Sequence, residues 1–257
     1  MEAGAITEHV DVAQIALYLF WLFFAGLVIY LQREARREGY PLLRGPHGSE
    51  KPVDMMMPAP KSFRTLGGRT VAAPNPATAD KRPLKARQVA GGPGSPFVPT
   101  GNPLADCIGP SSYAERPDIP DITFEKKPRI VPMRIASDFS IADGDPDPRG
   151  MAVLGADGKP AGKIVEAWVD RSEFILRYLE IELPGEGARR VMLPVNFCEI
   201  DKVGRKIRVG ALIASQFAGV PALKSPDQIT FLEEEKVTAY YGGGLLYATP
   251  DRQEPVL

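Results

Sequence analysis

Residues 17–41 read LYLFWLFFAGLVIYLQREARREGYP, an apolar run that turns abruptly basic. Between Val12 and Leu31 the chain carries no formal charge, and Gln14 is the only strongly polar residue there. About twenty helical residues rise ~30 Å, which matches the hydrocarbon core of a bilayer. Because the run is apolar on every helical face, we expect a membrane-spanning helix over residues 12–32.

Two other interpretations of the run are a cleaved signal peptide and a buried core helix. A signal peptide begins with a basic region, whereas the residues before this run include Glu2, Glu8 and Asp11 and no Lys or Arg. The run is also too long for a signal, and no small-residue cleavage site follows it. A core helix would have to be covered on all sides, so we favour a retained transmembrane helix.

Basic residues follow the apolar run at once. Arg33, Arg36 and Arg37 are the expected membrane-interface residues, and Arg44 lies close behind them. The positive-inside rule then places residues 1–11 in the periplasm and the rest of the chain in the cytoplasm. The sequence therefore predicts a single-pass protein of a bacterial inner (intracytoplasmic) membrane, with Cys107 and Cys198 as free thiols.

The segment of residues 33–130 is rich in proline and glycine, as in PFVPTGNP (residues 96–103) and ERPDIPDI (residues 115–122). Proline excludes long helices, so we expect an extended segment with at most short strands such as RTVAA, residues 69–73. A disordered linker and a strap on another protein's surface both fit this composition. Scattered apolar residues favour the strap, since a free linker needs few of them. These residues are Phe63, Leu66, Phe97, Leu104, Ile108 and Tyr113.

The pattern changes in residues 131–257, where short alternating segments predict strands. The segments are KIVEAWVD (residues 163–170), FILRYLEIEL (174–183), RRVMLPV (189–195) and CEIDKVGRKIRVGAL (198–212). Several short strands with tight turns indicate a small antiparallel β-barrel or sandwich. One helix follows, with Ser225 as its N-cap and Gln228 completing a capping box, and we expect Gly242–Gly244 to end it near Tyr241. The fold class is α+β.

The usual catalytic signatures do not occur in the sequence. There is no GxGxxG, P-loop or GxSxG pattern, and the histidines, His9 and His47, both precede the strand-rich region. No CxxC or His/Cys cluster indicates a metal site. No basic, aromatic-studded face indicates nucleic acid. We therefore expect a protein that is not itself an enzyme.

Carboxylates are the remaining candidates for chemistry. Asp170, Glu173 and Arg177 fall around one strand–turn–strand corner, and Glu233–Glu235 follow one another in FLEEEK. Such groups are ordinary solvated surface pairs in one interpretation. In the other, neighbouring carboxylates raise one another's pKa and carry protons near neutral pH. From the residues alone we would not choose the second interpretation.

Several motifs, in order along nearly the whole chain, resemble the H-subunit family of purple bacterial photosynthetic reaction centres. They include REARREGYPL (residues 33–42), PTGNPL (99–104), IGPSSYAERPD (108–118), WVDRSE (168–173) and LKSPDQITFLEEEKVTAYYGGGLLYATP (223–250). The resemblance implies a PRC-barrel as the strand-rich domain. It also implies a role as the cytoplasmic cap of the membrane subunits L and M.

In that family the cap supports assembly and the integrity of the quinone sites, and it conducts protons to the secondary quinone. Bacteriochlorophyll, bacteriopheophytin, quinones and a non-haem iron belong to the partner subunits, so the resemblance implies no cofactor bound by this chain. It allows a light-harvesting antenna ring, a cytochrome subunit and membrane lipid as further partners, and no nucleic acid.

The resemblance also assigns proton-transfer residues one by one. Glu173 matches the family's acid near the secondary quinone, and Asp170 and Arg177 match its neighbours. Some members carry histidines where protons enter, whereas this chain offers only Asp118, Asp121 and Glu125 there. A membrane-anchored PRC-barrel adaptor without pigment partners is the alternative function. The membrane span with its basic flank favours the reaction-centre subunit.

Overall fold

The computed structural model describes residues 5–7, 10–38, 56–65, 68–75, 77, 82–90, 95–185, 187 and 189–253. It divides the chain into two compact units. The first unit is Met1–Pro83 with Gln88–Pro96, and the second is Leu84–Arg87 with Phe97–Leu257. Arg44, Leu66 and both histidines lie outside the described residues. The boundaries after residues 11, 32 and 130 stay a prediction.

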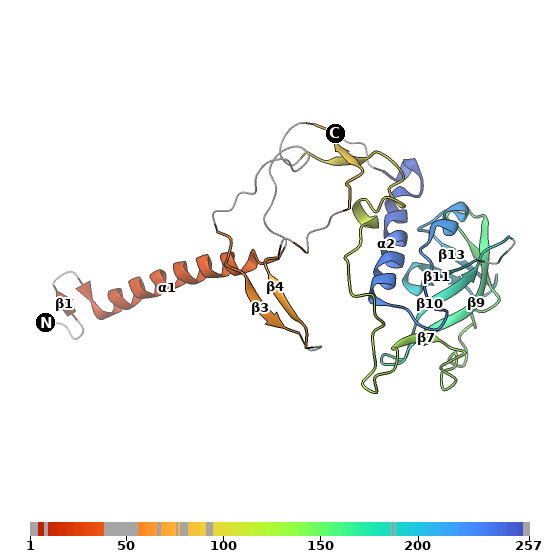
Figure 1. Cartoon of the computed structure of the whole chain (residues 1–257), viewed down its shortest axis with the longest axis horizontal. Helices are drawn as coiled ribbons and strands as arrows, with labels where there is room; N and C mark the ends of the chain where they lie inside the picture. Colours follow the sequence, from red (N-terminus) through yellow and green to blue (C-terminus); the bar gives the residue numbers. More distant parts are fainter. Residues whose placement is uncertain are drawn as a thin grey trace. The chain divides into compact units, whose positions relative to one another are not determined.

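The apolar run forms one long helix, α1 (Val12–Ala35), preceded by the short strands β1 (Ala5–Thr7) and β2 (Val10–Asp11) (Figure 1). The side chain of Asp11 caps the helix by accepting a hydrogen bond from the backbone N–H of Gln14 at 2.6 Å. Its 24 residues rise ~36 Å, which is enough to span a bilayer. No residue of α1 is buried by the protein, as expected of a helix whose apolar faces meet lipid.

A hairpin of β3 (Lys61–Arg64) and β4 (Thr70–Ala73) belongs to the same unit as α1. Arg37, just past the helix, connects the two. Its guanidinium pairs with Glu34 and donates to the carbonyl oxygens of Ala59 and Ala73, at 2.7 and 3.1 Å. The end of α1 therefore carries a hydrogen-bonded hairpin, and the strand expected at RTVAA is present.

Part of the proline-rich segment packs into the second unit. Leu104 and Ile108 are 4% and 8% exposed, and Lys236 lies 5.3 Å above the ring of Tyr113. Phe63 and Phe97 remain about half exposed. The segment also forms β5 (Ala86–Gln88), β6 (Phe97–Pro99) and the short 3-10 helix η3 (Gly109–Ser111). The part of this segment that belongs to the second unit is thus structured.

A seven-stranded sheet forms the body of the second unit. Its strands are β7 (Ile130–Pro132), β8 (Ala152–Leu154), β9 (Pro160–Asp170), β10 (Ile175–Glu182), β11 (Arg190–Pro194), β12 (Cys198–Asp201) and β13 (Lys206–Val209). The order is β11-β10-β9-β8-β13-β12, with β7 paired to β9. The ladders are antiparallel except for β8–β13, which is parallel. The four strand segments expected from the sequence are all present.

Three short 3-10 helices connect or close this unit: η4 (Val195–Phe197), η5 (Ala214–Gly219) and η6 (Pro250–Arg252). The fully buried core includes Trp168, Leu179, Ile207 and Phe217. Trp168 and Leu179 come from β9 and β10, Ile207 from β13 and Phe217 from η5. The ends of β9 and β10 are buried on both faces, with four successive buried residues on each strand.

The helix α2 (Phe231–Tyr247) covers the sheet (Figure 1), but both of its expected ends were wrong. Thr230, not Ser225, is the N-cap, and its capping box is completed by Glu233. The helix also continues through the three glycines. A Cβ on Gly243 would lie 2.7 Å from the Cβ of Ser111 in η3, and one on Gly244 would lie 2.3 Å from the carbonyl oxygen of Ala211, so these two glycines allow close packing of α2.

The turn between β9 and β10 contains an unusual residue. Phe174 has φ +58° in the left-handed region, where a bulky side chain costs about 1–2 kcal/mol. Its N–H bonds to the carbonyl of Asp170 at 2.9 Å and closes the turn. The residue is nevertheless 77% exposed, and its ring stacks on that of Phe139 with centroids 5.4 Å apart.

Candidate functional site

The acids at the β9–β10 corner converge on one arginine that the sequence analysis did not single out. Arg129 immediately precedes β7, and β7 pairs with the end of β9, so Ile130 lies opposite Asp170. The backbone of Arg129 also bonds to Asp121 and Arg171, at 2.8 and 2.9 Å. This pairing fixes the guanidinium at the corner where Asp170 ends its strand.

Asp170 is the buried member of the cluster, with no exposed surface. Nε of Arg129 lies 2.9 Å from both of its carboxylate oxygens. The backbone N–H groups of Ser172 and Glu173 donate to Oδ1 at 2.9 and 3.1 Å. Burial opposes ionisation, but these donors outweigh it, so the pKa of Asp170 lies below its ordinary value. Asp170 is therefore a fixed negative charge.

Glu173 and Asp121 take the two remaining nitrogens of the same guanidinium. Arg129 Nη2 pairs with Glu173, whose side chain is 50% exposed, and Nη1 lies 3.1 Å from Asp121 Oδ2. Arg177 approaches Asp170, not Glu173, with Nε 3.5 Å from Oδ2. The pKa of Arg129 is raised, first by its bond to Asp170. We call these five residues the charged corner: Asp121, Arg129, Asp170, Glu173 and Arg177.

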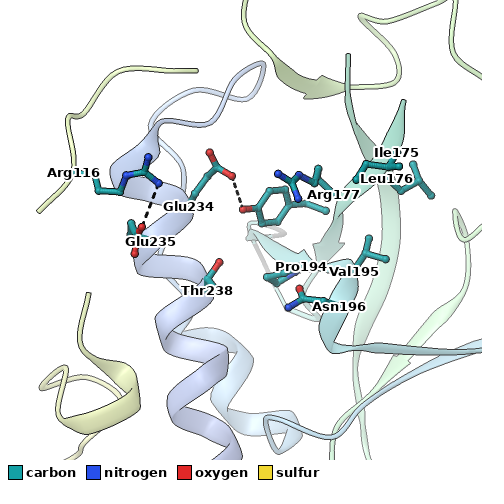
Figure 2. A pocket seen from close by; sticks show the side chains of 11 residues that line it. Arg116, Ile175, Leu176, Arg177, Pro194, Val195, Asn196, Glu234, Glu235 and Thr238 are labelled. Atoms are coloured by element: carbon teal, nitrogen blue, oxygen red, sulfur yellow. Dashed lines mark hydrogen bonds and ion pairs between the residues drawn. The ribbon is translucent and has the colours of Figure 1, made fainter. Parts of the chain in front are cut away.

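Arg177 also lines a pocket of about 580 Å³ between β10, η4 and the first turns of α2. Figure 2 shows Glu234 on α2 directed toward the strand side of this pocket, where Arg177 lies. Tyr178 donates its hydroxyl hydrogen bond to Glu234 Oε2 at 2.9 Å. Burial, the largest influence, raises the pKa of Glu234, although the hydrogen bond and the charge of Arg177 oppose it. Glu234 is thus an acid that holds its proton to higher pH than an exposed glutamate does.

The three consecutive glutamates of FLEEEK do different things in the structure. Glu233 is buried and caps α2, where it also accepts from the N–H of Lys224 at 2.7 Å. Glu234 faces the pocket, and Glu235 pairs with Arg116 at 3.3 Å (Figure 2). Arg116 in turn lies 4.4 Å above the ring of Phe231. The run is therefore not one carboxylate cluster, because successive helical residues point in different directions.

The other acids expected in proton transfer lie outside the charged corner. Asp118 pairs with Lys224 and accepts from the hydroxyl of Thr230 at 2.9 Å, and these contacts lower its pKa. Glu125 is exposed, and hydrogen bonds from its own backbone and from Thr123 lower its pKa. The structure thus brings together four of the six residues predicted, namely Asp121, Asp170, Glu173 and Arg177. It adds Arg129 and Glu234.

The expected membrane-interface residues all lie at the end of α1. Arg33 is exposed in the last turn, and Arg36 is the C-cap. Arg37 is committed to Glu34 and to the hairpin, and its side chain is only 10% exposed. Contact of these residues with headgroups stays a prediction.

The sequence did contain a signal for Arg129. An acid that ends an apolar strand, as Asp170 does, needs a basic partner when it is buried. Arg129, Arg171 and Arg177 are the nearby arginines, and it is the β7–β9 pairing that brings Arg129 to Asp170. Among the described residues, no group of three His, Cys, Asp or Glu side chains could hold a metal ion.

Two family models match the chain. Residues 4–135 match the photosynthetic reaction centre H-chain N-terminal region, and residues 141–212 match the PRC-barrel domain. The first match spans more than half of the chain and includes α1, Asp121 and Arg129. The second includes β8–β13, and with them Asp170 and Glu173. The charged corner is therefore assembled from both matched regions.

Proposed function

The chain belongs to the photosynthetic reaction centre H-chain family, and we propose that it caps the cytoplasmic side of the pigment-binding L and M subunits and conducts protons toward the secondary quinone. As a member it is a membrane-anchored subunit of the reaction centre complex. The same proposal includes a periplasmic N-terminus. It also includes an antenna ring, a cytochrome subunit and lipid as neighbours. The absence of cofactors bound by this chain itself belongs to it as well.

The physical need for such a cap comes from quinone chemistry. A quinone reduced by two electrons takes up two protons, and a buried negative semiquinone without compensation is costly. The cap must exclude bulk water and still leave a path for protons. Ionisable side chains and water between the cytoplasm and the membrane subunits meet both needs.

The observation that carries the proposal is the single guanidinium of Arg129 shared by a buried and an exposed acid. Asp170 stays ionised and fixes Arg129, so we assign it a positioning role. Glu173 is half exposed and within reach of water, so we assign it the transfer step. Arg177 connects this corner to the pocket of Glu234, where an acid of raised pKa is available.

We predict that Glu173→Gln slows the second, proton-coupled electron transfer to the secondary quinone and leaves the first almost unchanged. Gln keeps the shape and can still accept from Arg129, but it cannot take up and release a proton. We expect a loss of about tenfold or more, which corresponds to ~1.4 kcal/mol in the barrier. Flash-induced kinetics of both transfers, with proton uptake followed by a pH dye, measure it.

Glu182→Gln is the matched control, because Glu182 lies at the far end of β10 and pairs with Arg190 at 3.7 Å. Near-infrared absorbance of the purified complex verifies that each variant is assembled with its pigments. If both transfers in Glu173→Gln match wild type from about pH 6 to about pH 9, the transfer role of Glu173 is wrong.

A further inference from the structure

The β3–β4 hairpin of the first unit has no hydrophobic core of its own. Every residue of β3 is exposed, and so are the first three residues of β4. Phe63 and Val71 lie opposite each other in the hairpin and are 45% and 36% exposed. An isolated two-stranded hairpin is only marginally stable in water. The hairpin therefore presents half-exposed apolar side chains and needs a further surface to pack against.

The base of the hairpin is fixed at the end of the membrane-spanning helix. Arg37 donates to backbone carbonyls on both sides of the hairpin, and Lys61 Nζ lies 3.0 Å from Glu34 Oε2 on α1. Lys61 and Phe63 alternate along β3 and share one face, so this face is turned toward α1. Figure 1 shows the hairpin leaving the end of α1 to one side of the helix axis. Because a spanning helix ends at the lipid headgroups, the hairpin begins at their level.

A groove of about 390 Å³ lies between α1 and the chain that leads into β3. Gly26 and Ile29 line its apolar end, and Arg33 lines its charged end. The helix rises ~10 Å from Gly26 to Arg33. A Cβ on Gly26 would meet no atom within 4 Å, so the apolar end is open. The groove thus passes from apolar to basic toward the membrane surface, in the same order as the chains and the phosphate of a phospholipid.

Basic residues dominate both the groove and the hairpin. The side chain of Arg33 is exposed and makes no hydrogen bond or ion pair among the described residues. The groove carries three basic residues against one acid, Glu34. Between residues 55 and 79 there is no Asp or Glu, whereas Lys61, Arg64 and Arg69 all belong to the hairpin. Basic segments next to a membrane span are attracted to the anionic lipids of the cytoplasmic leaflet.

We propose that the hairpin and the groove together bind an anionic phospholipid of the surrounding membrane. We call Arg33, Lys61, Phe63 and Val71 the lipid face. Arg33 and Lys61 pair with the headgroup phosphate, where a guanidinium forms strong, charge-assisted hydrogen bonds. The ring of Phe63 lies at the boundary of headgroups and acyl chains, which aromatic side chains favour. The occupant is a lipid and not a free phosphate, because a free ion would leave the apolar end of the groove empty.

The test measures binding of short-chain lipids to the full-length chain in a neutral detergent, by native mass spectrometry. Dihexanoyl phosphatidylglycerol should bind about tenfold or more tightly than dihexanoyl phosphatidylcholine, which has the same chains and no net charge. Arg33→Gln should reduce this preference by about fivefold, and Arg33→Lys, which keeps the charge, should retain it. Arg208→Gln is the matched control, because it removes an exposed arginine from β13 of the second unit.

Hydrogen exchange of the full-length chain in nanodiscs tests the hairpin itself. Amides of β3 and β4 should exchange about tenfold or more slowly in phosphatidylglycerol nanodiscs than in phosphatidylcholine nanodiscs. Phe63→Ala should shorten this protection, whereas Phe124→Ala, which removes a 99% exposed ring from the second unit, should not. About 1 M salt should also weaken it, because the Debye length falls to ~3 Å.

Equal affinity for the two lipids, or an undiminished preference in Arg33→Gln, would overturn the proposal. Displacement of the bound phosphatidylglycerol by an equal concentration of inorganic phosphate would assign the site to a free ion instead. Hairpin protection that arises only when stripped membrane subunits are added to phosphatidylcholine nanodiscs would assign the face to a protein partner.

The inference rests on the proposed function only in making its lipid neighbour specific. Both assays use the chain without quinone, so their outcome is independent of proton transfer by Glu173. A slow second electron transfer in Glu173→Gln together with equal binding of the two lipids would refute the lipid face alone.

Discussion

Asp170 and Glu234 are two carboxylates beside β10 that are withdrawn from water, yet their pKa values move in opposite directions. Asp170 is the more deeply buried of the two by exposed area, but its pKa is lowered. It accepts from an arginine and from two backbone N–H groups. Glu234 accepts from the hydroxyl of Tyr178 and has no comparable set of donors in the described residues.

The difference shows that hydrogen-bond donors, more than burial, decide whether these two carboxylates are charged. Burial disfavours the ionised form of both acids. For Asp170 that effect is reversed by the charged Nε–H of Arg129, which its two oxygens share, and by two backbone N–H donors. Asp170 is thereby held in its charged form, whereas Glu234 can hold a proton. Three substitutions test this contrast, from the largest expected effect to the smallest.

Arg129→Met should be the most damaging, because it leaves the buried charge of Asp170 without its main partner. Breaking one side of a buried pair costs about 3–5 kcal/mol of unfolding free energy. The pKa of Asp170 is lower in the folded chain than in the unfolded one. Its stabilisation is therefore present above about pH 4 and lost as pH falls through the folded value.

Urea unfolding of the full chain in detergent, with wild type and variant compared across pH, measures this loss. Adding Asp170→Asn to Arg129→Met removes the orphaned charge and should recover part of the stability. A loss below about 1 kcal/mol would mean that Arg129 behaves as an ordinary surface partner, and the contrast would fail.

Glu234→Gln should have an intermediate, pH-dependent effect. The pKa of Glu234 is higher in the folded chain than in the unfolded one. Above the ordinary value of 4.5, the folded chain therefore binds more protons at this residue than the unfolded chain does. Wild-type stability therefore falls as pH rises from there to the folded value, by at most ~1.4 kcal/mol per pH unit. Glu234→Gln lacks this pH dependence. Its free energy of unfolding relative to wild type should therefore rise with pH from 4.5 to the folded pKa of Glu234 and then level off. Parallel stability profiles for the two proteins would contradict the raised pKa.

Arg177→Met should have the smallest effect on stability. Arg177 is 41% exposed and 3.5 Å from Asp170, and exposed pairs contribute less than about 1 kcal/mol. The charge of Arg177 lowers the pKa of Glu234, so removing it should raise that pKa. The pH range over which stability falls, called the window here, should then extend to higher pH. Arg190→Met is the control, since Arg190 begins β11 opposite Glu182 at the far end of β10, and it should leave that window unchanged. An unchanged window in Arg177→Met would mean that the two sites are not coupled.

The helix α2 shows why local sequence signals did not predict its two ends. SPDQ carries a good N-cap and capping box, yet TFLE, five residues later, carries another, and the chain uses the second. Local propensity could not choose, because Thr230 also bonds to Asp118, 112 residues earlier in the chain. The glycines 242–244 read as a stop signal and are instead a place where η3 and Ala211 approach the helix closely.

The candidate site was predictable to a similar degree. Asp170, Glu173 and Arg177 were expected at one corner, and they lie there, but Glu173 was expected beside Arg177 and pairs with Arg129. The proton-transfer roles of these residues stay a prediction. Glu234 was visible in FLEEEK only as one of three equivalent acids, and nothing local distinguishes the one that faces Tyr178.

The sequence by itself determined the transmembrane helix, the strand segments and the family, because these follow from contiguous residues: twenty uncharged positions, period-two alternation and ordered motifs. Only the tertiary structure decided which acid is fixed in its charged form and which can hold a proton. That depends on Arg129 reaching Asp170 across 41 residues and on Tyr178 reaching Glu234 across 56. Donors brought together by strand pairing and helix packing have no local signature, and they are what sets the charge of a buried carboxylate.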